Sequence, residues 1–156
     1  MKSIFRYENK PTNNFLGTDG SSDAITLFDT GMIRYEHYLF RCDTPSEIRE
    51  VGPFPEVVMV VEKIIALYAS EIECFPDFID NNCFDGNWQH FQLGEKKITV
   101  DNMQYYSEED IRAIRLFHQG ERLEKILESV QQTNKLVEIY HKIMDVMREY
   151  CELHLT

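Results

Sequence analysis

The sequence predicts an α+β fold in which an antiparallel β-sheet, built from hairpins, is covered on one face by helices. Three observations lead to this prediction. The first third is rich in β-branched and aromatic residues, a second hairpin pattern follows near residue 90, and the last third repeats apolar residues every three or four positions. The 156 residues, 43% of them hydrophobic, contain neither repeats nor a low-complexity linker, so one domain over residues 1–156 is expected.

The first part of the sheet is predicted from a hairpin pattern. Ile25–Phe28 and Met32–Phe40 are the expected strands, and Asp29-Thr30-Gly31 is a short turn whose glycine supplies a positive φ. Ile4–Tyr7 is an expected additional strand. Asn9 to Asp23 is rich in Asn, Gly, Ser and Thr and is predicted to form an exposed loop.

The middle of the chain predicts a helix followed by a second hairpin. Pro55 suits the first position of a helix, and Val57 to about Ile72 is apolar around most of the helical circumference, which predicts a mostly buried helix. Its VVMVV start leaves a strand as the alternative. Trp88–Leu93 and Lys96–Val100 are predicted strands, joined by a type II′ turn at Gly94-Glu95.

The last third predicts two helices separated by a glycine. Ser107 is the expected cap of a helix from Glu108 to about His118, and Gly120 then breaks or bends the chain. A long C-terminal amphipathic helix follows and is expected to cover the sheet. The polar run 131–134 (QQTN) interrupts its apolar stripe, which predicts a bend or a division into two helices.

The charge balance limits the classes of partner. There are 27 acidic and 16 basic residues, a formal net charge of −11. Such a surface offers no counter-charge to phosphates, so direct binding of nucleic acid or of a membrane surface is disfavoured. The first residues lack a secretory pattern, and a cytoplasmic location is expected. The four cysteines are accordingly expected to be free and mostly buried thiols: Cys42, Cys74, Cys83 and Cys151.

Motifs for catalysis, metals and cofactors are missing from the sequence. The two glycine-rich motifs that bind phosphates, GxxxxGK[ST] and GxGxxG, do not occur. No cysteine or histidine has a partner at zinc-ligand spacing, and Glu138-x-x-His141 lacks the second copy that a di-metal bundle needs. We therefore expect a protein that is not an enzyme and has no cofactor and no small-molecule substrate. A small enzyme using carboxylate and histidine acid–base chemistry remains an alternative, because catalytic groups assemble from distant residues.

The acidic residues are unevenly distributed along the chain. Residues 43–85 contain ten acids and two bases, and within them Glu71–Trp88 has five acids and no base, alternating with aromatic residues. This stretch is either a solvated loop whose aromatic side chains enter the core, or an acidic, aromatic surface for a basic protein. The second interpretation gives seven candidate partner-binding residues: Glu71, Glu73, Asp77, Asp80, Asn82, Asp85 and Trp88.

One segment resembles a known class of proteins. The stretch DGNWQHFQLGEKKITVDN (Asp85–Asn102) is similar to segments in immunity proteins of contact-dependent growth inhibition systems. The resemblance implies a protein that neutralises a cognate toxin. Together with the charge, it predicts an acidic immunity protein that inhibits a basic toxin nuclease by direct 1:1 binding. The alternative binding protein is a phage-type inhibitor of a nucleic-acid-guided defence complex, whose acidic face imitates nucleic acid.

Overall fold

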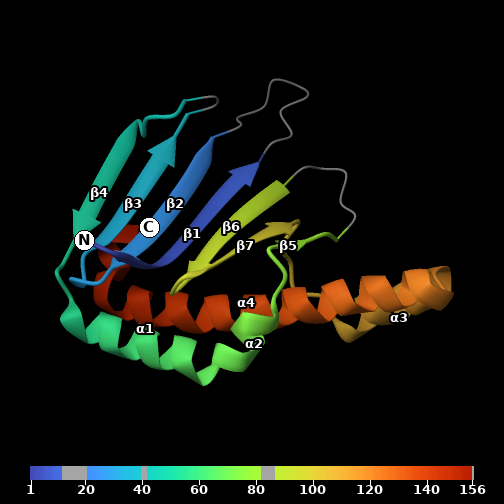
Figure 1. Ribbon diagram of the computed structural model, residues 1–156. Coiled ribbons are helices and arrows are strands. Elements are labelled where there is room, and N and C mark those ends of the chain that lie inside the picture. Colours follow the sequence, from blue (N-terminus) through green and yellow to red (C-terminus); the bar gives the residue numbers. More distant parts are fainter. Residues whose placement is uncertain (12–20, 40–41, 82–86, 156) are drawn as a thin grey trace.

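The computed structural model of the chain describes residues 1–11, 21–39, 42–81 and 87–155. In this part of the chain one seven-stranded sheet and four helices form an α+β fold, as predicted (Figure 1). The strands are β1 (Ser3–Pro11), β2 (Ser22–Phe28), β3 (Ile33–Tyr38), β4 (Glu47–Val51), β5 (Phe78–Ile79), β6 (Asn87–Leu93) and β7 (Lys96–Asp101). The helices are α1 (Pro55–Leu67), α2 (Ala69–Cys74), α3 (Glu108–Phe117) and α4 (Gly120–Leu155).

The sheet has the strand order β4-β3-β2-β1-β6-β7-β5. All neighbours are antiparallel except β5, which lies parallel to β7. The central strand β1 joins the two predicted hairpins and is longer than expected, because Asn9 pairs with both Asp23 and Gln89. Both ends of the predicted loop at 9–23 therefore belong to strands, and residues 12–20 lie outside the described residues.

The two outermost strands were not predicted. β4 has four exposed residues and one half-buried residue, so it lacks the alternation of a half-buried strand. β5 contains only two residues, of which Ile79 is buried and Phe78 is exposed. In the second hairpin, by contrast, β6 and β7 match the expected strands, and Gly94 at the turn has a φ of 63°.

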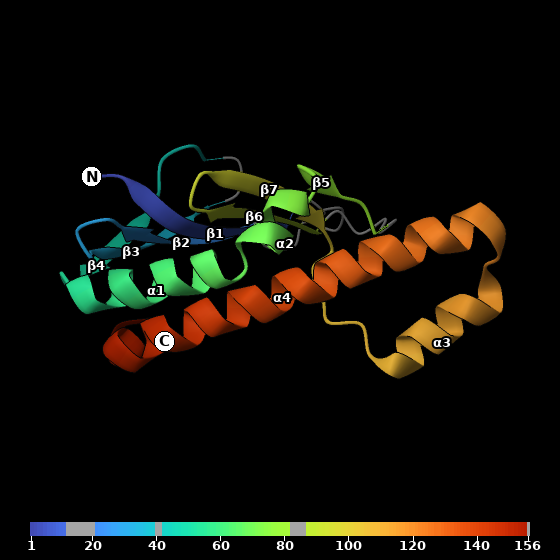
Figure 2. The same ribbon diagram turned by 60° about the horizontal axis from the view of Figure 1, so that its bottom comes forward.

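The helices lie on one face of the sheet (Figure 2). The helix expected over 57–72 is divided at Tyr68 into α1 and α2. The expectation that it is mostly buried was wrong, because one side of α1 packs on α4 and the sheet while the other faces solvent. Val57 and Val61 are fully buried, whereas Met59 is 62% exposed and Leu67 71% exposed.

α3 and the first half of α4 form an arm that projects beyond the sheet (Figure 2). The predicted cap is present: the Ser107 hydroxyl accepts a hydrogen bond from the Asp110 backbone, and the Asp110 carboxylate accepts one from Ser107. α4 begins at Gly120 and continues through residues 131–134, so the expected division is absent. That polar run forms tertiary contacts instead, because the side chain of Asn134 bonds both backbone groups of Tyr106.

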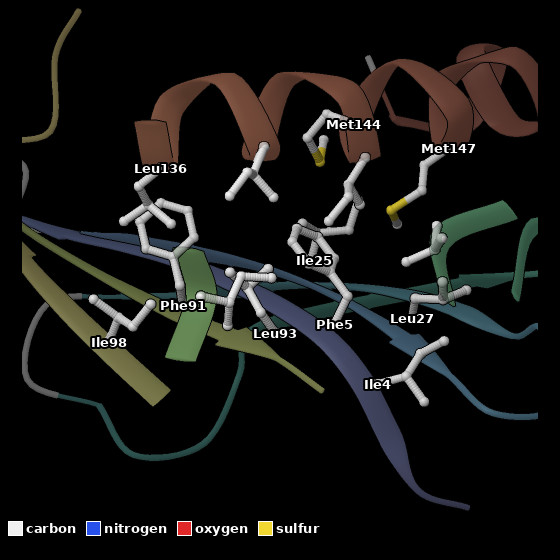
Figure 3. Close-up of a cluster of buried hydrophobic side chains, with 14 of the residues drawn as sticks. Ile4, Phe5, Ile25, Leu27, Phe91, Leu93, Ile98, Leu136, Met144 and Met147 are labelled. Carbon is white, nitrogen blue, oxygen red and sulfur yellow. The ribbon is translucent and has the colours of Figure 1, made fainter. Parts of the chain in front are cut away.

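The main hydrophobic core lies between the sheet and α4. Figure 3 shows Phe5, Leu27 and Leu93 of the sheet beneath Leu136 and Met147 of α4. All five are at most 2% exposed. Burying a side chain of this size stabilises a fold by about 1.5–3 kcal/mol, so this layer fixes α4 across the strands.

The cysteines depart from the prediction. Cys42 and Cys74 are free and exposed rather than buried. Cys42 lies in the connection between β3 and β4, and Cys74 lies at the outward-facing end of α2. Cys83 and the side chain of Cys151 lie outside the described residues.

Candidate partner-binding surface

The described members of the predicted partner-binding set gather near one edge of the sheet. Glu71 and Glu73 belong to α2, Asp77 connects α2 to β5, and Asp80 follows β5 directly. Trp88 reaches this edge from β6, two strands away from β5. We call this region the β5 edge. Asn82 and Asp85, the other two predicted residues, lie outside the described residues.

Two aromatic side chains meet at the β5 edge. The alternation of β5 sends Ile79 into the core, where it is 1% exposed, and leaves Phe78 41% exposed. The rings of Phe78 and Trp88 are in contact, with their centroids 5.2 Å apart. An exposed phenylalanine supported by a half-buried tryptophan is the type of anchor that contributes most to binding in protein interfaces.

Exposed carboxylates precede and follow Phe78 in the chain. Glu73, Asp77 and Asp80 are all exposed. The side chain of Asp77 is 97% exposed, and its carboxylate lies 3.9 Å from the ammonium of Lys96. Because the Asp77 carboxylate is almost fully in solvent, an ion pair at that distance is weak, so Asp77 keeps most of its negative field.

Glu71 differs from the other three acids because α4 partly offsets its charge. It is half-buried and accepts a hydrogen bond from the hydroxyl of Ser70 at 3.1 Å. The pKa of Lys135 on α4 is raised, mainly by its hydrogen bond to Glu138 and to a smaller extent by Glu71. Glu71 is therefore the least available of the described candidates.

An open hollow of about 500 Å³ separates the β5 edge from α4. Phe78, Asp80 and Cys74 line it from one side, and Lys125 and Glu128 are among the α4 residues on the other. A hollow of this volume has room for protruding side chains of a partner protein. Its walls combine the ring of Phe78 with the carboxylates of Asp80 and Glu128 and the ammonium of Lys125, so they offer both apolar and charged contacts.

Asn81 fixes the β5 edge to the rest of the molecule. Its side-chain amide donates to the carbonyl of Asp101 at 3.0 Å and to the hydroxyl of Thr133 at 3.0 Å. Thr133 is fully buried, and its hydroxyl donates in turn to the carbonyl of Ser129 at 2.8 Å. These bonds hold the residues next to Asp80 in one position, so the surface is formed before a partner arrives.

The acidic residues of the range 43–85 do not form one surface. Glu47 and Glu50 lie on β4, at the opposite edge of the sheet from β5. Both are paired with arginines there, Glu47 with Arg49 at 3.0 Å and Glu50 with Arg34 at 3.3 Å. Only the second half of the acidic run therefore contributes to the β5 edge.

A second polar cluster, which the sequence interpretation missed, lies on the face of the sheet towards the helices. One carboxylate oxygen of Asp23 accepts a hydrogen bond from the Tyr35 hydroxyl at 2.5 Å and lies 2.7 Å from Nδ1 of His37. Burial and the hydrogen bond to Asp23 raise the pKa of Tyr35 to about 12. A cavity of about 170 Å³ adjoins the cluster and is also lined by Tyr140 and Arg148.

The hairpin register would have revealed this cluster. β2 and β3 pair so that Leu27 lies opposite Ile33, and continuing that register places Asp23 opposite His37. A carboxylate bonded to an imidazole and a phenol is the arrangement that the alternative of carboxylate–histidine chemistry requires. The described residues contain no group of three or more His, Cys, Asp or Glu side chains that could hold a metal ion.

The chain was compared with models of known protein families and with curated proteins, and neither comparison gives a match. Among the helices of the described residues, none combines the length and the apolar character needed to cross a membrane.

Proposed function

We propose that this protein is an acidic binding protein that neutralises a basic protein partner, and that it acts as an immunity protein inhibiting a cognate toxin nuclease by 1:1 binding. The observation that carries the proposal is the β5 edge. There, three exposed carboxylates (Glu73, Asp77 and Asp80) lie on the same short segment as the exposed Phe78, which contacts Trp88.

The charge of this surface favours a basic partner. A net charge of −11 attracts a cationic protein over several ångströms and raises the rate of encounter. Nucleases grip phosphates with lysine and arginine, so their binding grooves carry the complementary charge. Phe78 and Trp88 then supply an apolar contact, which the surrounding charged residues of an interface do not provide.

The assignment to immunity proteins is supported by the position of the resembling segment. Residues 87–101 of that segment form β6, the turn and β7, the hairpin next to β5. Trp88 belongs to this hairpin, so the segment that resembles immunity proteins contributes directly to the candidate surface.

The test begins with affinity capture from the native host at low salt and identification of the captured protein. Association rates are then measured for a variant carrying Glu71→Gln, Glu73→Gln, Asp77→Asn and Asp80→Asn. The matched control changes the net charge equally on α4: Glu121→Gln, Glu124→Gln, Asp145→Asn and Glu149→Gln. The β5-edge variant should associate at least about tenfold more slowly and lose most of the salt dependence, while the control stays within about threefold of wild type.

Three outcomes would count against the proposal: an acidic partner, binding that salt does not affect, or equal effects of the two variants. A captured nucleic-acid-guided defence complex would instead favour the phage-type inhibitor.

A second candidate function, a small enzyme, rests on the cluster of Asp23, Tyr35 and His37 beside the 170 Å³ cavity. The two functions are separated by the variants Asp23→Asn and His37→Gln. An inhibitor that acts by binding at the β5 edge keeps its activity against the toxin when this cluster is changed. An enzyme that destroys or modifies its target loses that activity.

A further inference from the structure

The two edges of the sheet differ in their capacity to pair with another strand. β5 has two residues and follows Pro76 closely, which leaves little backbone for pairing. β4 is a regular five-residue strand, paired to β3 without a shift of register from Glu47 to Val51. Among the described residues β3 is the only strand beside β4, so the other side of β4 presents backbone groups to solvent.

β4 has only one of the usual protections of an edge strand, its charged side chains. Natural edges are commonly blocked by charged residues (above all lysine), proline, a bulge or very short length, because an open edge is a template for another chain. The sequence of β4, EIREV, has no proline or lysine, and its three charged residues are of both signs, so they oppose only those pairings that bring like charges together. Its central region instead exposes an apolar residue, Ile48, which is 53% exposed.

The charges on β4 are symmetric about Ile48. Glu47 and Arg49 flank it and share one face of the strand, with the Arg49 guanidinium 3.0 Å from the Glu47 carboxylate. If a second copy of β4 lies antiparallel with Ile48 opposite Ile48, each Glu47 falls opposite an Arg49 of the other copy. Opposite charges directly across a strand pair are favourable.

We propose that β4 is a self-association surface, on which two copies of this chain pair their β4 strands antiparallel about Ile48. The charges select this register over its neighbours. If the strand pair is centred on Arg49 instead of Ile48, the two Arg49 guanidinium groups lie opposite each other. If it is centred between Ile48 and Arg49, Glu47 of one copy lies opposite Glu50 of the other. Both of these arrangements oppose like charges and are disfavoured.

The pairing continues the sheet from one copy into the other. Residues opposite each other in this register have the same orientation, so the helix-covered faces of the two copies lie on the same side. The β5 edges lie at the two far ends of the combined sheet and stay accessible. A strand pair of five residues buries little surface, so the dimer is weak and depends on concentration.

The oligomeric state tests this proposal without a partner protein. The mass of the wild-type chain is measured by sedimentation over a concentration series up to about 1 mM, a range that detects a dimer with a dissociation constant as weak as about 1 mM. Wild type should pass from monomer to dimer within the series. A monomer mass at every concentration would overturn the proposal.

Charge reversal tests the register. Glu47→Arg and Arg49→Glu each place like charges across the pair and should raise the dimer dissociation constant at least about tenfold. A mixture of the two variants restores both opposite-charge pairs and should form a heterodimer as strong as the wild-type dimer. Glu50→Arg is the matched control, because it makes the same change of charge on the same strand but lies opposite Ser46.

Ile48→Lys completes the test. The side chain is exposed, so the variant should keep the fold, and circular dichroism checks this. This variant should be monomeric. A dimer that survives Ile48→Lys, or a mixture no stronger than the single charge variants, would show that association uses another surface.

Discussion

The bond between Asn81 and Thr133 gives the sharpest test of how the β5 edge is positioned. Asn81→Ala removes the donor to the carbonyl of Asp101 at 3.0 Å and to the hydroxyl of Thr133. Thr133→Val keeps the side-chain volume but removes the hydroxyl at a position that is 0% exposed. Each change leaves a partly or fully buried polar group without its partner, which costs about 1–3 kcal/mol in the free energy of unfolding.

The two changes should not be additive. Because each removes the same 3.0 Å bond, the double variant should lose about 1 kcal/mol less than the sum of the single variants. Urea unfolding of the four proteins, followed by circular dichroism, measures this coupling energy. The control combines Asn81→Ala with Ser107→Ala. Ser107 caps α3 and shares no bond with Asn81, so the two losses in the free energy of unfolding should add within about 0.5 kcal/mol. Coupling no larger for Thr133 than for Ser107 would refute the anchoring role of Asn81.

Three other changes test the fold. Ile143→Ala empties a fully buried position on α4 and should lower the free energy of unfolding by about 2–5 kcal/mol in the same urea assay. Ser107→Ala removes the capping box of α3 and should cost about 0.5–2 kcal/mol, with a loss of helical signal. The pKa of Tyr35 is raised from 10.0 to about 12, so its contribution to stability is full below pH 10 and is lost as the pH rises towards 12. Tyr35→Phe should remove this pH dependence of the free energy of unfolding. The absorbance of phenolate in a pH titration should then show one late-titrating tyrosine fewer.

Local patterns predicted the elements whose signals are contained within a few residues. The second hairpin could be predicted because Gly94 supplies the positive φ between two alternating strands. The cap of α3 could be predicted because Ser107 and Asp110 bond each other three residues apart. β4 could not, because a strand exposed at a sheet edge has no buried face to impose alternation.

In the candidate site, too, features contained within a few residues could be predicted, whereas contacts between distant parts of the chain could not. Glu73, Asp77 and Asp80 lie within eight residues of one another, so the chain keeps them within about 25 Å in any fold. The bond from Asn81 to Thr133 spans 52 positions and depends on how α4 crosses the sheet, which no local pattern contains. The polar run 131–134 was therefore interpreted as a weakness of the helix when its side chains are tertiary anchors.

Trp88 provides the most direct measurement of the central claim, that a basic protein binds at the β5 edge. It is the only tryptophan of the chain and contacts Phe78, so fluorotryptophan labelling gives a single ¹⁹F resonance at the candidate surface. Saturation with the captured basic partner should shift this resonance, and Asp77→Asn with Asp80→Asn should weaken the titration. A resonance that stays in place while the partner is fully bound would contradict the claim, because the contact would then lie elsewhere on the molecule.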